Sequence, residues 1–142
     1  MSYSRLHMRF GWWSLAIFLS LGFILESFHG LTLGFYLDVR NETRRLMWTL
    51  AHSHGTLLAL VNIAFGASVG QLAGWPVSRL RLASRCLRMG SVLLPVGFFS
   101  GGILVHGGDP GLSILIVPAA AVLLIAAVLL IAAGTRHIPG DA

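Results

Sequence analysis

The sequence predicts an all-α integral membrane protein, a four-helix bundle with its N and C termini in the cytoplasm. Of the 142 residues, 56% are hydrophobic and only 11% are charged, whereas about a quarter of the residues in soluble domains are charged. Four windows are long and apolar enough to cross a hydrocarbon core of about 30 Å, which takes roughly 20 helical residues. The arginines gather between these windows, where basic residues orient membrane proteins.

The four predicted spans follow one another with short, polar breaks. The first covers residues 10–35 and the second 46–69, separated by "DVRNETRR". The third covers 87–105 and the fourth 112–133, and the breaks "GWPVSRLR" and "HGGDPG" carry the glycine and proline typical of turns. Because the loops are too short to hold another unit, we expect residues 1–142 to form a single transmembrane domain.

The distribution of arginine predicts the orientation. The termini and the loop between spans two and three hold Arg5, Arg9, Arg79, Arg81, Arg85, Arg88 and Arg136. The opposite side holds Arg40, Arg44 and Arg45. Because the more basic side of a membrane protein is usually cytoplasmic, both termini are expected inside. Arginine without any lysine indicates a GC-rich bacterial genome, so we predict a multi-pass protein of the bacterial inner membrane.

The net charge of +5 does not predict a nucleic-acid partner, because the arginines form no continuous basic face. The expected partners are the lipid bilayer and either other membrane subunits or further copies of this chain.

Most of the titratable side chains within or beside the spans fall near the predicted outer surface. They are Glu26, His29, His52, His54 and His106. At a rise of 1.5 Å per residue, His29 and His52 lie within about 10 Å of that boundary. His7 and His137 lie at the cytoplasmic ends and are predicted to be ordinary surface residues.

Small and polar residues recur on one face of each of the first three spans, which favours close helix packing or a bound group. The second span has His52, Gly55, Ala59, Asn62 and Gly66 on this face. The first has Gly11, Phe18, Gly22, Glu26 and His29, and the third has Ser91, Pro95, Phe98, Gly102 and His106. His52 and His54 are about 200° apart around a helix. If His52 faces the core, His54 faces a neighbouring helix edge, the lipid or a partner.

Glu26 requires a partner or a neutral state, because a carboxylate in the middle of a span costs about 2.5–3.5 kcal/mol on insertion scales. The candidate partners are His29, one turn further along the same helix, and Arg44 or Arg45 from the outer loop. A tether of this kind would close the bundle without any chemistry.

Inward-facing imidazoles from two helices can ligate a haem iron, and nearby glycines would leave room for the macrocycle. The same rings with Glu26 could bind copper, iron or zinc. We therefore predict a haem b or transition-metal site near the outer, periplasmic face, in a redox or metal-handling subunit of a membrane complex. Its first ligands are His29 and His52, with His54 and His106 as further candidates and Glu26 as a ligand or orienting acceptor. Asn62, Gly22, Gly55, Gly66, Arg44 and Arg45 would support the site.

The segment "LAHSHGTLLAL" at 50–60 resembles the second helix of haem–copper oxidase subunit I, and small four-span bacterial membrane proteins related to it. The resemblance implies that His52 or His54 ligates a haem in an electron-transfer complex. Oxygen reduction is not implied, because the chain has too few spans and lacks the adjacent His-His pair of the copper centre.

Two other functions remain open from the sequence. The chain could be a structural or assembly subunit whose polar residues tie helices to one another or to partners. It could also be an oligomeric carrier of protons or small molecules. No phosphate-binding motif, cysteine pair or nucleophile–base set marks the isolated chain as an enzyme.

Overall fold

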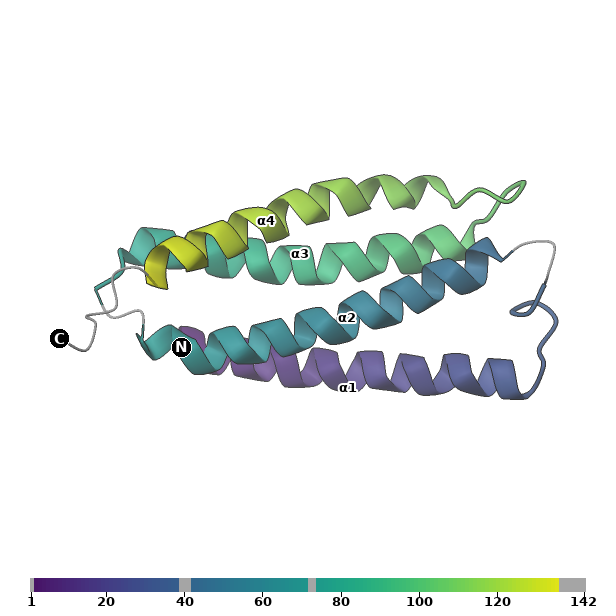
Figure 1. Ribbon diagram of the computed structural model, residues 1–142, viewed down its shortest axis with the longest axis horizontal. Coiled ribbons are helices and arrows are strands. Elements are labelled where there is room, and N and C mark those ends of the chain that lie inside the picture. The colour runs from purple at the N-terminus through teal and green to yellow at the C-terminus, as the bar shows by residue number, and fades with distance from the viewer. Residues whose placement is uncertain (1, 39–41, 72–73, 136–142) are drawn as a thin grey trace.

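Four long helices make up most of the protein in the computed structural model (Figure 1), which describes residues 2–38, 42–71 and 74–135. They are α1 (Tyr3–Gly30), α2 (Thr43–Ser68), α3 (Val77–Ile103) and α4 (Ile116–Thr135). Short 3-10 turns, Val69–Gln71 and Leu112–Leu115, follow α2 and precede α4. All four helices are long and apolar enough to cross a membrane, and the described residues form no β-strand. The predicted all-α fold with four candidate spans is confirmed.

The helices differ in length from the predicted spans. α1 begins at Tyr3 and α3 at Val77, several residues before the apolar windows, because the arginine-bearing segments continue the helices into the polar region. α1 ends at Gly30 rather than at 35. The chain turns there, and Thr32 adopts a positive φ of 51°, a left-handed conformation that a helix cannot contain.

Each helix packs against its neighbour in sequence, so the structure consists of an α1–α2 pair beside an α3–α4 pair (Figure 1). Two clusters of buried apolar side chains join α2, α3 and α4. One contains Phe65, Trp75, Ala83, Cys86, Leu87 and Ala127, and the other contains Leu58, Leu94 and Ala120. α1 contributes to neither cluster and packs mainly against α2.

Glycines form the contact between α1 and α2. A Cβ at Gly11 would lie 2.9 Å from the carbonyl oxygen of Ala59, and one at Gly66 would lie 2.9 Å from the backbone nitrogen of Met8. The two backbones therefore meet directly, as small residues allow in membrane helices. The predicted face of the second span does point into the interior, since Gly55, Ala59, Asn62 and Gly66 are buried.

The predicted face of the first span is correct only in part. Gly11 and Gly22 are buried, but Glu26 and His29 are exposed. The buried surface continues from Gly22 to Leu25, three residues on, instead of to Glu26, four residues on. This small rotation turns the carboxylate outward.

Aromatic side chains and arginine close the predicted outer end. The Trp48 ring lies between Tyr36 (centroids 6.2 Å apart) and Phe99 (5.4 Å), and its indole N–H donates to the Phe99 carbonyl at 3.1 Å. Arg44 donates to the carbonyl of Gly102 at 3.2 Å, which satisfies one of the acceptors that a helix C-terminus leaves open.

Arg44 and Arg45 form contacts other than the pairing with Glu26 that the sequence suggested. Arg44 also donates to the Phe35 carbonyl, and Arg45 pairs with Glu42 at 3.1 Å. Both guanidinium groups are engaged in loop and helix-end contacts, so neither serves as the tether predicted for Glu26.

Candidate functional site

Two of the predicted site residues, Glu26 of α1 and His52 of α2, line the same groove. It has a volume of about 260 Å³ and is also lined by Gly22, Tyr36 and Thr49. Glu26 is exposed, and no hydrogen bond or ion pair to its carboxylate is found within the described residues. The groove thus presents a carboxylate and an imidazole between the C-terminal part of α1 and the N-terminal half of α2.

The His52 ring is fixed by a contact with the backbone of α1. Its Nδ1 lies 2.8 Å from the carbonyl oxygen of Phe18. Because a carbonyl can only accept, Nδ1 carries the proton, and Nε2 keeps its lone pair. A carbonyl that holds the first ring nitrogen is the usual arrangement behind a metal-ligating histidine.

His54 faces another part of the molecule, as its angular separation from His52 predicts. Its Nδ1 donates to the Leu50 carbonyl of its own helix at 2.8 Å. Its ring lies against Phe98 of α3, with centroids 5.1 Å apart. His52 therefore contacts α1, whereas His54 contacts α3.

The two remaining histidines lie at the surface. His29 is exposed in the last turn of α1. His106 is exposed in the loop before α4, where its backbone pairs with Asp109 in both directions at 3.0 and 3.1 Å. Among residues 2–38, 42–71 and 74–135, no three His, Cys, Asp or Glu side chains converge so that they could hold a metal ion. The single cluster predicted from the sequence is thus reduced to Glu26 and His52.

Aromatic and imidazole rings of the protein occupy the space beside the glycines that were expected to leave room for a macrocycle. A Cβ at Gly22 would overlap the His52 imidazole, one at Gly55 would overlap the Phe18 ring, and one at Gly102 would overlap the Trp48 indole. These residues do not fit a haem, since the space beside each glycine is occupied by a side chain of the same chain.

The most enclosed polar cluster lies at the other end of the molecule and joins three helices. His7 of α1 is 0% exposed. Its Nδ1 lies 2.8 Å from the amide oxygen of Asn62 on α2, and its Nε2 lies 2.8 Å from the hydroxyl of Ser84 on α3. Asn62 also donates to Ser91 of α3 at 2.8 Å. We call these four residues the His7 cluster.

Hydrogen-bond geometry determines the direction of the bonds in the His7 cluster. The Asn62 amide nitrogen has two acceptors, the Leu58 carbonyl and the Ser91 hydroxyl, both at 2.8 Å. The Asn62 oxygen must then face His7, so Nδ1 of His7 donates. The Ser91 hydroxyl donates to the Leu87 carbonyl at 2.7 Å. Every amide and imidazole group in the cluster therefore has a partner.

The expectation that His7 is an ordinary surface residue is wrong. Gly11 is one turn beyond His7 on the glycine face of the first span, and Ser84 is two turns before Ser91 on the third. Extending both patterns towards the N-terminal ends of these two helices would have found the cluster. The cluster was not predicted because the neighbouring arginines suggested that these segments are solvated. His137 lies outside the described residues.

Comparison with known proteins gave no match to any family model, curated protein or solved structure. The likeness of residues 50–60 to haem–copper oxidases therefore remains a prediction. The function has to be argued from the geometry of the chain itself.

Proposed function

We propose that this chain is a structural subunit of a membrane complex in the bacterial inner membrane, with both termini in the cytoplasm. The observation that carries this proposal is the use of its buried polar groups. His7, Asn62, Ser84 and Ser91 hydrogen-bond to one another across α1, α2 and α3, so they tie helices together and offer no reactive group. The arginine distribution supports the orientation.

The position of Glu26 on α1 supports the presence of a partner subunit. It follows Phe10 by 16 residues, or about 24 Å along a helix, so it lies inside a hydrocarbon layer of about 30 Å that begins near Phe10. An unpaired carboxylate at this depth is unfavourable. Since Glu26 is exposed on α1, a donor on a neighbouring protein would satisfy it.

We expect the chain, extracted with a mild detergent, to migrate on a native gel in a discrete complex several times larger than its 15.3 kDa. Glu26→Gln should release a large part of it as free chain, because the donor of the partner loses its charged acceptor. Glu42→Gln is the matched control, since Glu42 pairs with Arg45 of the same chain. A wild-type chain that migrates alone, or equal release by both variants, would contradict the proposal.

A second function is supported by the groove that contains Glu26 and His52: binding of a copper, iron or zinc ion. Nε2 of His52 keeps its lone pair because Nδ1 donates to the Phe18 carbonyl, and the Glu26 carboxylate lines the same groove. These two groups would supply two ligands, and water or a partner would complete the coordination.

After chelator treatment and reloading with one metal at a time, elemental analysis should find about one ion per chain. His52→Phe and Glu26→Gln should each abolish this binding. His54→Phe should leave it unchanged, because His54 contacts Phe98 on another side of α2. Equal loss in all three variants, or no ion in the wild type, would overturn the metal site.

A further inference from the structure

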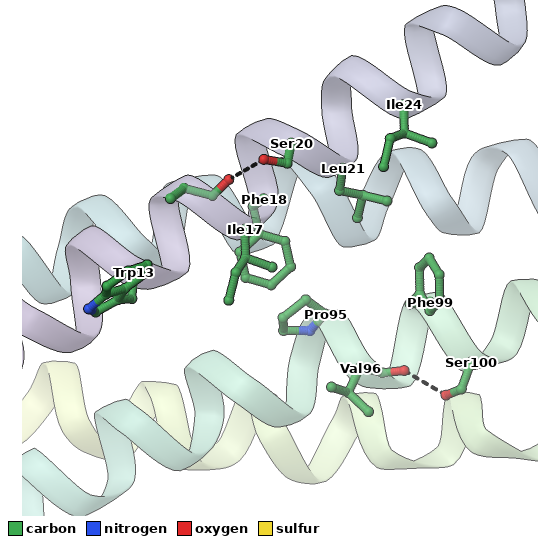
Figure 2. Close-up of a pocket in the computed structure, with 11 residues that line it drawn as sticks. Trp13, Ile17, Phe18, Ser20, Leu21, Ile24, Pro95, Val96, Phe99 and Ser100 are labelled. Atoms are coloured by element: carbon green, nitrogen blue, oxygen red, sulfur yellow. Dashed lines mark hydrogen bonds between the residues drawn. The ribbon is translucent and has the colours of Figure 1, made fainter.

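An apolar groove of about 710 Å³ lies between α1 and α3. Figure 2 shows side chains of the two helices pointing towards the same space, among them Ile17, Leu21 and Ile24 of α1 and Pro95 and Phe99 of α3. Hydroxyl groups are present, but those of Ser20 and Ser100 bond to carbonyls of their own helices at 2.9 and 2.6 Å. The surface that remains for an occupant is therefore hydrocarbon.

The groove continues towards the arginine-rich end. Trp13 and Ile17 line both the apolar groove and a second hollow that contains Arg9 and Arg88. Arg88 also lines a third hollow, together with Arg85. The three hollows share lining residues, and we call them together the channel: its apolar section is the apolar groove, and Arg9, Arg85 and Arg88 line the rest.

The side chains of these three arginines are unpaired in the part of the chain that the structure describes. There, Arg9, Arg85 and Arg88 form no side-chain hydrogen bond or ion pair. Nε of Arg88 is buried and lacks an acceptor, which is unfavourable. Arg85 and Arg88 are three residues apart on one helix, where like charges repel. An anion placed beside Arg85 and Arg88 would offset this repulsion.

We propose that this channel binds one anionic phospholipid from the cytoplasmic leaflet. An acyl chain lies in the apolar section, and the phosphate lies against Arg9, Arg85 and Arg88. From Trp13 to Ile24 the apolar section extends about 16 Å along α1, which matches one leaflet of a hydrocarbon core of about 30 Å. The inference relies on the membrane orientation proposed above but not on a partner subunit.

Charge complementarity distinguishes a lipid from a helix as the occupant. An apolar transmembrane helix of a second copy would cover the apolar section but would bring no anion to Arg9, Arg85 and Arg88. A phospholipid supplies both the apolar chain and the acceptor oxygens, and phosphate oxygens are strong acceptors for arginine.

Native mass spectrometry of the purified full chain tests the proposal, with phosphatidylglycerol and phosphatidylethanolamine of identical acyl chains as probes. We expect one phosphatidylglycerol per chain to be retained, with much weaker retention of the zwitterionic lipid. Each basic side chain near an anionic lipid contributes about fivefold to binding. The double variant Arg85→Gln/Arg88→Gln should therefore bind about 30-fold more weakly.

The matched control is Arg79→Gln/Arg81→Gln, which removes the same charge from the same helix outside the channel and should bind normally. Ile17→Trp, which fills the apolar section, should also weaken binding, and glycerol phosphate without acyl chains should not compete. Equal effects of the two arginine pairs, equal binding of the two lipids, competition by the chain-free anion, or a dimer that excludes lipid would each overturn the proposal.

Discussion

Asn62→Leu is expected to destabilise the protein by about 2 kcal/mol, within the range for leaving buried partners unpaired. The leucine removes the acceptor of the His7 Nδ1 proton and the donor to Ser91. Both His7 and Ser91 are buried, so water does not replace the lost partner. Thermal unfolding in detergent, followed by the loss of helical circular dichroism, measures the change.

A double-mutant cycle shows whether the loss comes from the hydrogen bond. We expect His7→Phe and Asn62→Leu to be less destabilising together than the sum of their separate effects, with a coupling above 0.5 kcal/mol. Ser53→Ala is the control, because the exposed Ser53 hydroxyl bonds only to the Thr49 carbonyl of its own helix. Additive effects of the pair would show that the two side chains do not interact in the folded state.

Hydropathy predicted the four spans because an apolar run of about 20 residues has few alternatives to a membrane helix. It did not predict the helix ends, since a helix such as α3 continues through polar positions until a turn interrupts it. The run "VSRLRLASRCLR" looks like a loop by charge, yet it forms the first half of α3. Arginines mark the predicted end of the apolar span, but they do not mark the end of the helix.

The candidate site was harder to predict, because the sequence gives the angle of a residue on its own helix but not the position of the neighbouring helices. His52 and His54 were correctly separated, as this follows from one helix alone. His29 would lie beside His52 only if the face of α1 that carries Gly22 and Glu26 continued to face α2 up to the predicted outer end. After Gly22 the next buried residue of α1 is Leu25 instead of Glu26. His29, which follows Glu26 on the predicted face, is therefore exposed.

Gly11→Leu is expected to cost about 3 kcal/mol, at the upper part of the usual range for overpacking. A Cβ at Gly11 would lie 2.9 Å from both the Ala59 carbonyl oxygen and the Ile63 nitrogen. These are backbone atoms, which cannot rotate aside, so α1 has to move away from α2. The same thermal unfolding measures the effect, and Gly30→Leu is the control because no atom lies near a Cβ at Gly30.

The chemical nature of each obstacle allows a sharper test of this interface. A Cβ at Gly55 meets a side chain, the Phe18 ring, whereas a Cβ at Gly11 meets two backbone atoms besides the Ile63 side chain. Gly55→Ala should therefore cost much less stability in a Phe18→Ala background than in the wild type, and this difference is the recovery. The equivalent pair, Gly11→Ala with Ile63→Ala, should recover little, because the Ala59 carbonyl stays in place. Recovery in both pairs would mean that α1 is held by side-chain packing, and that the two backbones do not touch.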